Sequence, residues 1–250
     1  MCFELDSLPP IPPIEGGAID HRDLVLESAD GNRFAAFAAV PEEPSGNGVV
    51  ILPDVRGLYR FYEELALRFA ERGIAAVAID YFGRTAGTEK RGDDFEHMEH
   101  VAQTMPEGIQ ADVRAAVEWL REAGSKSIFT VGFCFGGRNS WLSAAGGHGL
   151  AGAVGFYGHP GERDSPGPTK RAGEIDAPIL ALQAGDDQNI AAELNAEFEE
   201  ALTAAGVEHE VVTYPDAPHS FFDRRYEEFA DDSADAWQRV LAFIERYGAE

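Results

Sequence analysis

One cysteine, Cys134, stands where its side chain can act as a nucleophile. It is the central residue of GFCFG (132–136), which follows the apolar run 127–132 and precedes a run of helical character. Such a pentapeptide between a strand and a helix is typical of a sharp turn that lifts the central side chain above the sheet. At the helix N-terminus the dipole favours the thiolate, and the N–H of Phe135 can bind a developing oxyanion. The alternative is a buried structural cysteine with glycines that permit close packing.

An acyl-transfer nucleophile needs a base and a group that orients the base. Two later predicted strands are followed by AGDDQ, which holds Asp186 and Asp187, and by PDAPHSF, which holds His219. The order nucleophile, acid, histidine is the one expected after a turn of this kind. Most loop aspartates and histidines are not catalytic, so it is the joint placement that favours a triad. The residues leave Asp186 and Asp187 both open, and Asp216 is a weaker candidate because it shares the loop of His219.

The loop after the first core strand supplies the second half of an oxyanion hole. It reads LPDVRG over residues 52–57, and the N–H of Val55 is the natural second donor. Asp54 is expected close to Cys134, where its carboxylate can hold the thiol or take its proton. The alternative is that Asp54 only caps the loop.

Hydrophobic patterns place these residues on an alternating series of strands and helices. Apolar runs predict strands. Apolar residues at helical spacing predict the helices between the strands, and an apolar stripe near the C-terminus predicts a last helix. The predicted strands are 23–26, 33–40, 48–52, 74–79, 127–132, 151–157, 178–183 and 207–214, with helices near 62–69, 109–120, 137–145, 194–205 and 237–244, and irregular segments at 80–106 and 158–174. The sequence therefore predicts an α/β fold, with a mostly parallel sheet and helices on both faces.

Composition excludes several classes of protein. The chain has 250 residues, 44 of them acidic and 20 basic, which gives a net charge of −24. This charge argues against non-specific nucleic-acid binding and against anionic membrane surfaces, but it does not identify a substrate. The longest apolar stretch, about 74–79, is too short for a transmembrane helix.

The N-terminal residues are expected to form a separate arm. Residues 1–22 hold Cys2, several prolines and early acidic residues, which are not features of a signal peptide, and one domain is expected over 23–250. With two cysteines, reduced thiols in a cytoplasm are the simpler interpretation. The expected assembly is a monomer or a homodimer.

Four segments together resemble the dienelactone hydrolase family of α/β-hydrolases. They are GFCFGG (132–137), GDDQ (185–188), PHSF (218–221) and the loop 52–57 followed by IDYFGR (79–84). The resemblance runs from about residue 20 to the C-terminus. It implies the α/β-hydrolase fold and a Cys–Asp–His triad that acts on a lactone or a small ester, as in the opening of dienelactones during chloroaromatic breakdown, without a cofactor.

The resemblance also implies a role for individual positions. By position, Cys134 is the nucleophile, His219 the base and Asp187 the orienting acid, while the N–H groups of Val55 and Phe135 form the oxyanion hole. Arg84 matches a family arginine that binds the substrate carboxylate.

This sequence departs from the family pattern at two positions. The family's glutamate, which is tied to activation of the resting thiol, is Asp54 here. The second substrate-binding arginine corresponds to Asp223, which weakens the expected pocket for an anionic substrate.

Other residues have weaker assignments. Residues 85–108 are a candidate lid or pocket wall, Tyr81 a candidate apolar wall, and Arg138 a candidate pocket residue one turn after Cys134. His97 and His100 have a spacing that suits a metal ligand pair, but a third ligand is missing, so no metal is expected.

Three functions remain open at this stage. The first is a dienelactone-type hydrolase for anionic lactones, and the second is a general small-ester or thioester hydrolase with a different pocket. The third is a redox-sensing protein whose Cys134 is oxidised but turns nothing over.

Overall fold

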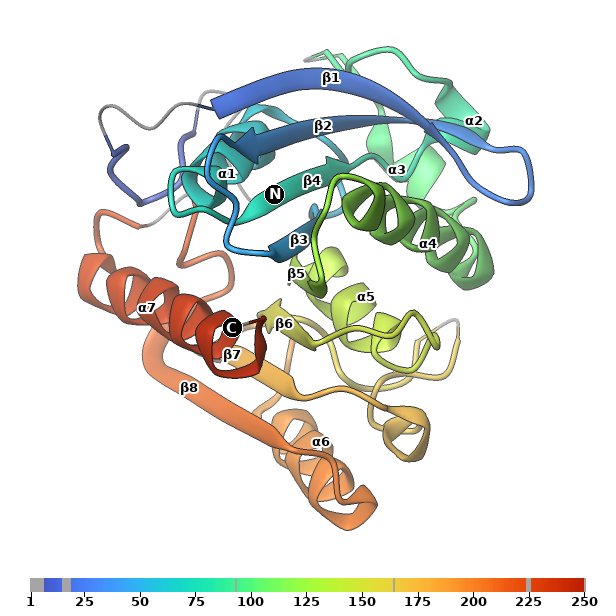
Figure 1. Cartoon of the computed structure of the whole chain (residues 1–250). Coiled ribbons are helices and arrows are strands. Elements are labelled where there is room, and N and C mark those ends of the chain that lie inside the picture. The colour runs from blue at the N-terminus through green and yellow to red at the C-terminus, as the bar shows by residue number, and fades with distance from the viewer. Residues whose placement is uncertain (1–6, 15–18, 93, 164, 224–225, 250) are drawn as a thin grey trace.

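The structure is a computed structural model that describes residues 7–14, 19–92, 94–163, 165–223 and 226–249. In this part of the chain, an eight-stranded sheet is flanked by helices (Figure 1). The strands are β1 (Ile19–Glu27), β2 (Arg33–Pro41), β3 (Asn47–Leu52), β4 (Ala75–Ile79), β5 (Ser127–Phe133), β6 (Gly152–Phe156), β7 (Ile179–Asp186) and β8 (His209–Pro218). The helices are α1 (Arg60–Ala70), α2 (Gly83–Ala86), α3 (His97–Val101), α4 (Pro106–Glu122), α5 (Phe135–Ser143), α6 (Ala192–Ala205) and α7 (Ala230–Tyr247), with a 3₁₀ turn η1 at Ala172–Glu174.

The strand order is β1-β2-β4-β3-β5-β6-β7-β8. The first two strands form an antiparallel hairpin, and β2 is also antiparallel to β4. Every other neighbouring pair is parallel. The prediction of an α/β fold with a mostly parallel sheet is therefore confirmed.

Helices cover both faces of the sheet, as predicted. Along β3 the buried side chains alternate, with Val49 and Ile51 packed on one face and Val50 and Leu52 on the other. Helices α1 and α7 contribute to the first apolar cluster, and α4, α5 and α6 to the second (Figure 1). Strands apolar on both faces are what a parallel sheet buried between helices requires.

The structure differs from the sequence prediction in the 80–106 segment and at the first strand. The segment 80–106, expected to be irregular, holds the short helices α2 and α3. Strand β1 begins at Ile19, so residues 19–22 of the expected arm belong to the sheet. Of the rest of the arm, residues 7–14 are described, and there Ile11 is buried and the N–H of Ile14 donates to Glu71 beyond the end of α1. Cys2 lies outside the described residues.

Across the described residues, no helix is both long and apolar enough to cross a membrane.

A buried histidine connects the loop after α5 to helix α4. His148 is 3% exposed, its Nε2 lies 2.8 Å from the side-chain oxygen of Gln110, and its carbonyl accepts a hydrogen bond from Arg121. Burial, and then the positive charges of Arg114 and Arg121, lower the pKa of His148 to about 4 from an ordinary value of 6.5. The imidazole is therefore neutral in the folded protein at physiological pH.

This histidine should make the protein less stable in mild acid. Between pH 6.5 and about 4 the unfolded chain binds a proton at residue 148 and the folded chain does not, so stability is lost as the pH falls through this window. At about 1.4 kcal/mol per pKa unit, the loss approaches about 3 kcal/mol. The free energy of urea unfolding, measured at several pH values, should fall less steeply in His148→Gln than in the wild type. The exposed His21→Gln is the matched control, and equal slopes in all three proteins would refute the assignment.

Candidate active site

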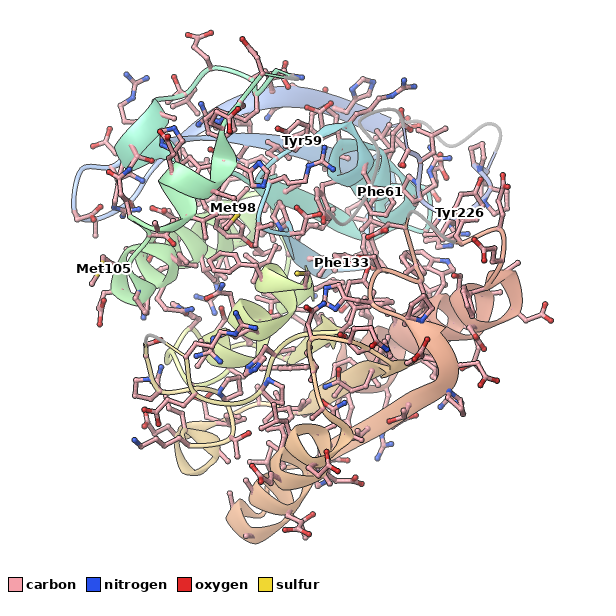
Figure 2. All side chains as sticks on the ribbon, turned by 180° about the vertical axis from the view of Figure 1, so that it is seen from behind. Tyr59, Phe61, Met98, Met105, Phe133 and Tyr226 are labelled. Carbon is pink, nitrogen blue, oxygen red and sulfur yellow. The ribbon has the colours of Figure 1, made fainter. Side chains whose placement is uncertain are left out.

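Cys134 occupies a sharp turn between β5 and α5. It is the single residue between the end of the strand at Phe133 and the start of the helix at Phe135, and its backbone has φ 56° and ψ −112°. A non-glycine residue with positive φ is strained, at an order of 1–3 kcal/mol, and persists only where the surrounding structure holds it. Figure 2 shows Phe133 where the blue-to-green half of the chain meets the yellow-to-red half. The turn thus lies where the two halves of the sheet join.

Two glycines make this turn possible. A Cβ on Gly132 would overlap the carbonyl of Gly136, and a Cβ on Gly136 would overlap the carbonyl of Leu52 in the neighbouring strand β3. The N–H of Cys134 donates to the carbonyl of Phe156 at 3.0 Å, which ties the turn to β6 as well. Cys134 is a half-buried free thiol. As the sequence predicts, it follows a core strand and precedes a helix.

The loop after β3 reaches the same place. Val55 lies beside Cys134 and Phe135 in the wall of one cavity. The loop is fixed by hydrogen bonds in which Arg56 N–H donates to the Asp54 carboxylate at 2.8 Å, and Leu58 N–H to Asp80 at 3.2 Å. The backbone that carries Val55 is therefore held in position before any substrate binds.

His219 and Asp187 form a hydrogen-bonded pair. His219 directly follows β8 and Asp187 directly follows β7, and Nδ1 of His219 lies 2.7 Å from Oδ2 of Asp187. The other carboxylate oxygen of Asp187 accepts the N–H groups of Asn189 and Ile190. Because a carboxylate accepts the Nδ1 proton, Nε2 is the basic nitrogen of the neutral ring.

The environment of Asp187 keeps its carboxyl ionised. Burial raises the pKa of Asp187, but the hydrogen bond and charge of His219, together with the N–H groups of Asn189 and Ile190, lower it more, so the pKa lies below the ordinary value. The neighbouring Asp186 is exposed, and its carboxylate accepts a hydrogen bond from Gln188. Of the two aspartates that the sequence leaves open, the structure places Asp187 on His219.

Tyr157 is a site residue that the sequence analysis missed. It directly follows β6, has φ 38°, and packs its ring 4.9 Å from the ring of His219. Its hydroxyl donates to the buried carboxylate of Asp223 at 3.2 Å. Its place at the carboxyl end of a core strand was the available signal, since polar side chains there gather at the site.

These residues surround a cavity of about 190 Å³. It contains five of the predicted site residues, namely Val55, Cys134, Phe135, Arg138 and His219. The remaining lining residues, which the sequence analysis did not name as site residues, are Tyr157, His159, Arg163, Asn189 and Ile190. The candidate nucleophile, base and oxyanion donors therefore share one small space, with Asp187 behind His219.

Arg84 does not line this cavity. Its guanidinium binds the carboxylates of Asp112 at 2.5 Å and Asp30 at 2.7 Å. The hydrogen bond from Arg84 lowers the pKa of Asp30 to about 2. The arginine thus ties the β1–β2 hairpin to helix α4. The structure does not bring it to the place that the family resemblance implies, because two acidic side chains from distant parts of the chain engage it.

Tyr81 and Asp54 also lie outside the cavity wall and support it from behind. The Tyr81 hydroxyl donates to the carbonyl of Pro53 at 2.8 Å, and its ring packs edge-on against Phe135 at 5.3 Å. Burial, and then the charges of Asp54 and Asp80, raise the pKa of Tyr81, so its hydroxyl remains a donor. Asp54 is fully buried. Its predicted action on the thiol remains a prediction.

The segment 85–108 does not reach the cavity either. Among its described residues, none lines the cavity, and Met98 and Met105 are 60% and 64% exposed (Figure 2). His100 stacks on Phe95 with the ring centroids 4.8 Å apart. Within the described part of the chain, no group of three or more His, Cys, Asp or Glu is placed to hold a metal ion.

The turn should be intolerant of a single methyl group. In Gly132→Ala the new Cβ would overlap the carbonyl of Gly136, so the turn must open, which typically costs about 1–3 kcal/mol. The matched control is Gly173→Ala, since a Cβ there meets nothing within 4 Å. Urea unfolding should show a clear loss of stability in the first variant and almost none in the second. A Gly132→Ala protein as stable as the control would contradict the close contact.

Comparison with known proteins agrees with this geometry. Residues 34–248 match the family described as "Dienelactone hydrolase family". The chain is 28% identical over 264 residues to "Carboxymethylenebutenolidase" of Rhodococcus opacus, with 99% of this chain and 97% of that protein covered. It is 30% identical over 232 residues to "Putative carboxymethylenebutenolidase" of Escherichia coli K12, with 89% and 86% covered.

A solved structure has the same fold. It is the "Putative Dienelactone Hydrolase" of Klebsiella pneumoniae, which superposes with a TM-score of 0.81 at 27% identity and covers 92% of this chain and 100% of its own. The chain therefore belongs to the dienelactone hydrolase family and has the α/β-hydrolase fold of that family.

Proposed function

We propose that this protein hydrolyses small carboxylic esters or lactones through a Cys134–His219–Asp187 triad and an acyl-thioester intermediate. The observation that carries the proposal is the 2.7 Å hydrogen bond between Asp187 and His219, with the imidazole and Cys134 lining the same cavity. The names of the relatives, carboxymethylenebutenolidases, support a substrate of the same class.

In the first half of the reaction, His219 Nε2 takes the proton of the Cys134 thiol. The sulfur attacks the carbonyl carbon, so an S–C bond forms and the carbonyl electron pair moves to oxygen. The oxyanion lies between the N–H groups of Val55 and Phe135, which are fixed before the substrate arrives. As the oxyanion collapses, the C–O bond breaks and the leaving alkoxide takes the proton from His219. An acyl thioester on Cys134 remains.

In the second half, His219 takes a proton from water, and the resulting hydroxide attacks the thioester carbonyl. The S–C bond breaks, the thiolate leaves and regains a proton, and a carboxylic acid is released. With a lactone, the alcohol and the acid belong to one molecule, so the product is a single ring-opened hydroxy acid. Sulfur suits both halves because it is a strong nucleophile and a tolerable leaving group.

Asp187 and Tyr157 keep the base in its working orientation. The carboxylate of Asp187 fixes the tautomer by accepting the Nδ1 proton and stabilises the imidazolium that forms during both proton transfers. The ring of Tyr157 packs against the imidazole and limits its tilt. Asp54, buried in the loop of Val55, is the proposed partner that activates the resting thiol.

The cavity favours a substrate smaller than a typical drug-sized ligand. Its volume of about 190 Å³ is below the usual range for drug-sized ligands. The engagement of Arg84 by Asp30 and Asp112 favours a pocket that differs from the one the family resemblance implies. The proposal therefore covers small esters and lactones in general and does not depend on Arg84.

Substitutions of the two adjacent aspartates, Asp186 and Asp187, test the triad. Asp187→Asn should lower kcat for para-nitrophenyl acetate by about 10²–10⁴, because the amide cannot hold the required tautomer. Asp186→Asn, which changes an exposed carboxylate one residue away, should leave kcat within about twofold. Cys134→Ala and His219→Ala should each reduce steady-state hydrolysis to background.

The remaining outcomes separate the alternatives. Hydrolysis that persists in Cys134→Ala would defeat the assignment of the nucleophile. A wild-type protein that alkylates at Cys134 but turns over no ester would instead favour a redox-sensing thiol. Equal losses in the two aspartate variants would remove the special role of Asp187.

A further inference from the structure

The cavity at Cys134 has the opposite charge character to the rest of the chain. Its described lining includes two arginines and two histidines and no aspartate or glutamate. The whole chain has 44 acidic and 20 basic residues. Asp187, the carboxylate behind His219, has a side chain that is 1% exposed. A substrate in this cavity therefore meets positive charge.

One of the two arginines, Arg138, uses its guanidinium in hydrogen bonds within the protein. Arg138, on the first turn of α5, is 7% exposed, and its guanidinium donates to the carbonyls of His159, Gly161 and Ser165. These three carbonyls belong to the loop between β6 and β7. Arg138 is therefore a positioning residue, which fixes this loop as a wall of the cavity.

The other arginine, Arg163, belongs to the loop that Arg138 holds. It is exposed at the cavity, and its guanidinium forms no ion pair with any carboxylate that the structure describes. Some arginines elsewhere in the fold are paired with carboxylates, as Arg91 is with Asp80 and Arg239 with Asp235 and Glu210, and others, such as Arg114 and Arg121, donate to backbone carbonyls. A planar guanidinium on a fixed loop is suited to bind a carboxylate through two hydrogen bonds.

His159 lies beside Arg163 in the same wall. Burial, and then the charges of Arg163 and Arg138, lower the pKa of His159, so its imidazole is uncharged at neutral pH. The neutral ring adds a hydrogen-bonding group without competing for the anion as a second cation. Arg138 also contributes positive charge, but its guanidinium is directed at backbone carbonyls, so Arg163 is the arginine of this wall that is placed to bind an anion.

We propose that Arg163 is a specificity-determining residue that binds a carboxylate on the substrate, from the β6–β7 loop. This inference rests on the proposed ester hydrolysis, because it concerns the substrate of that reaction. The charge of the cavity can be tested without any turnover. Neither the sequence motifs nor the position of Arg84 points to this loop. The substrate class is a small ester or lactone with a negatively charged substituent.

The first test compares two esters of the same shape and different charge. Para-nitrophenyl hydrogen glutarate has a terminal carboxylate, and para-nitrophenyl 5-oxohexanoate has a methyl ketone in its place. Arg163→Gln should lower kcat/KM for the glutarate by about tenfold or more, through KM, and change the oxohexanoate by less than about twofold. Arg163→Lys should recover part of the loss. Lys126→Gln, which removes an exposed charge just before β5 at the other end of that strand, should change neither value.

The second test measures the charge of the cavity without turnover. Iodoacetate and iodoacetamide both form an S–C bond with Cys134 as iodide leaves, but the first reagent is an anion. Mass spectrometry of the Cys134 peptide gives the two rates separately from Cys2. The ratio of the iodoacetate rate to the iodoacetamide rate should fall about threefold or more in Arg163→Gln and stay constant in Lys126→Gln.

The outcomes distinguish this inference from the proposed function. If both esters are hydrolysed, and Arg163→Gln changes neither the kcat/KM for the glutarate nor the ratio of alkylation rates, the inference is overturned and the triad stands. If no ester is hydrolysed, the proposed function fails and the alkylation ratio alone decides whether Arg163 holds an anion. If Lys126→Gln changes kcat/KM and the alkylation ratio as much as Arg163→Gln does, the effect comes from net charge and the assignment to Arg163 is overturned.

Discussion

The backbone contact between the turn at Cys134 and strand β3 is the constraint on which the site depends. Gly136 lies so close to the carbonyl of Leu52 that a side chain would not fit between them. The same contact therefore fixes two distances: the height of the sulfur above the sheet, and its position relative to the loop that carries Val55. An oxyanion hole made of one N–H from each side needs both. A glycine at position 136 thus supports the proposed site through its geometry alone.

The parallel sheet then brings the remaining groups to the same edge. Strands β3, β5, β6, β7 and β8 run in one direction, and the residues that follow them include Val55, Cys134, Tyr157, Asp187 and His219. Carboxyl ends of parallel strands meet at one edge, so residues far apart in sequence become neighbours without long loops. Cys134 and Tyr157 have positive φ, and each is tied to the neighbouring strand by a backbone hydrogen bond, from Cys134 N–H to Phe156 and from Tyr157 N–H to Leu182. These contacts hold residues of the candidate site in position although the residues lie outside the strands and helices.

Much of this arrangement is readable from the sequence because it follows from strand ends. Apolar runs locate the strands, and the residues after them include Cys134, His219 and a pair of aspartates. Strand ends alone leave Asp186 and Asp187 both open, and only the family resemblance implies Asp187. Adjacent side chains differ in the direction in which they point, and that direction is set by the hydrogen bonds of the folded loop. Position 84 resembled a family site, yet its partners lie 28 and 54 residues away in the chain.

Two of the residues missed by sequence reasoning, His159 and Arg163, lie on a loop with no periodic pattern. Residues 158–171 are rich in glycine and proline, so hydrophobic spacing gives no direction for His159 or Arg163. What orders the loop is a guanidinium from another element, since Arg138 binds three of its carbonyls. A tertiary contact of this kind leaves no local signal.

Net charge and local charge are separable in this protein. At physiological ionic strength, exposed charges are screened over about 8 Å, so most of the acidic surface is not felt inside the cavity. The field there is set by the few groups that line it, and among these Arg163 has no described carboxylate partner. Arg163 forms no ion pair with the described acidic residues, and its location in the wall beside Cys134 places its charge at the cavity. The acidic composition therefore argues against anionic polymers as partners but does not argue against a small anionic substrate.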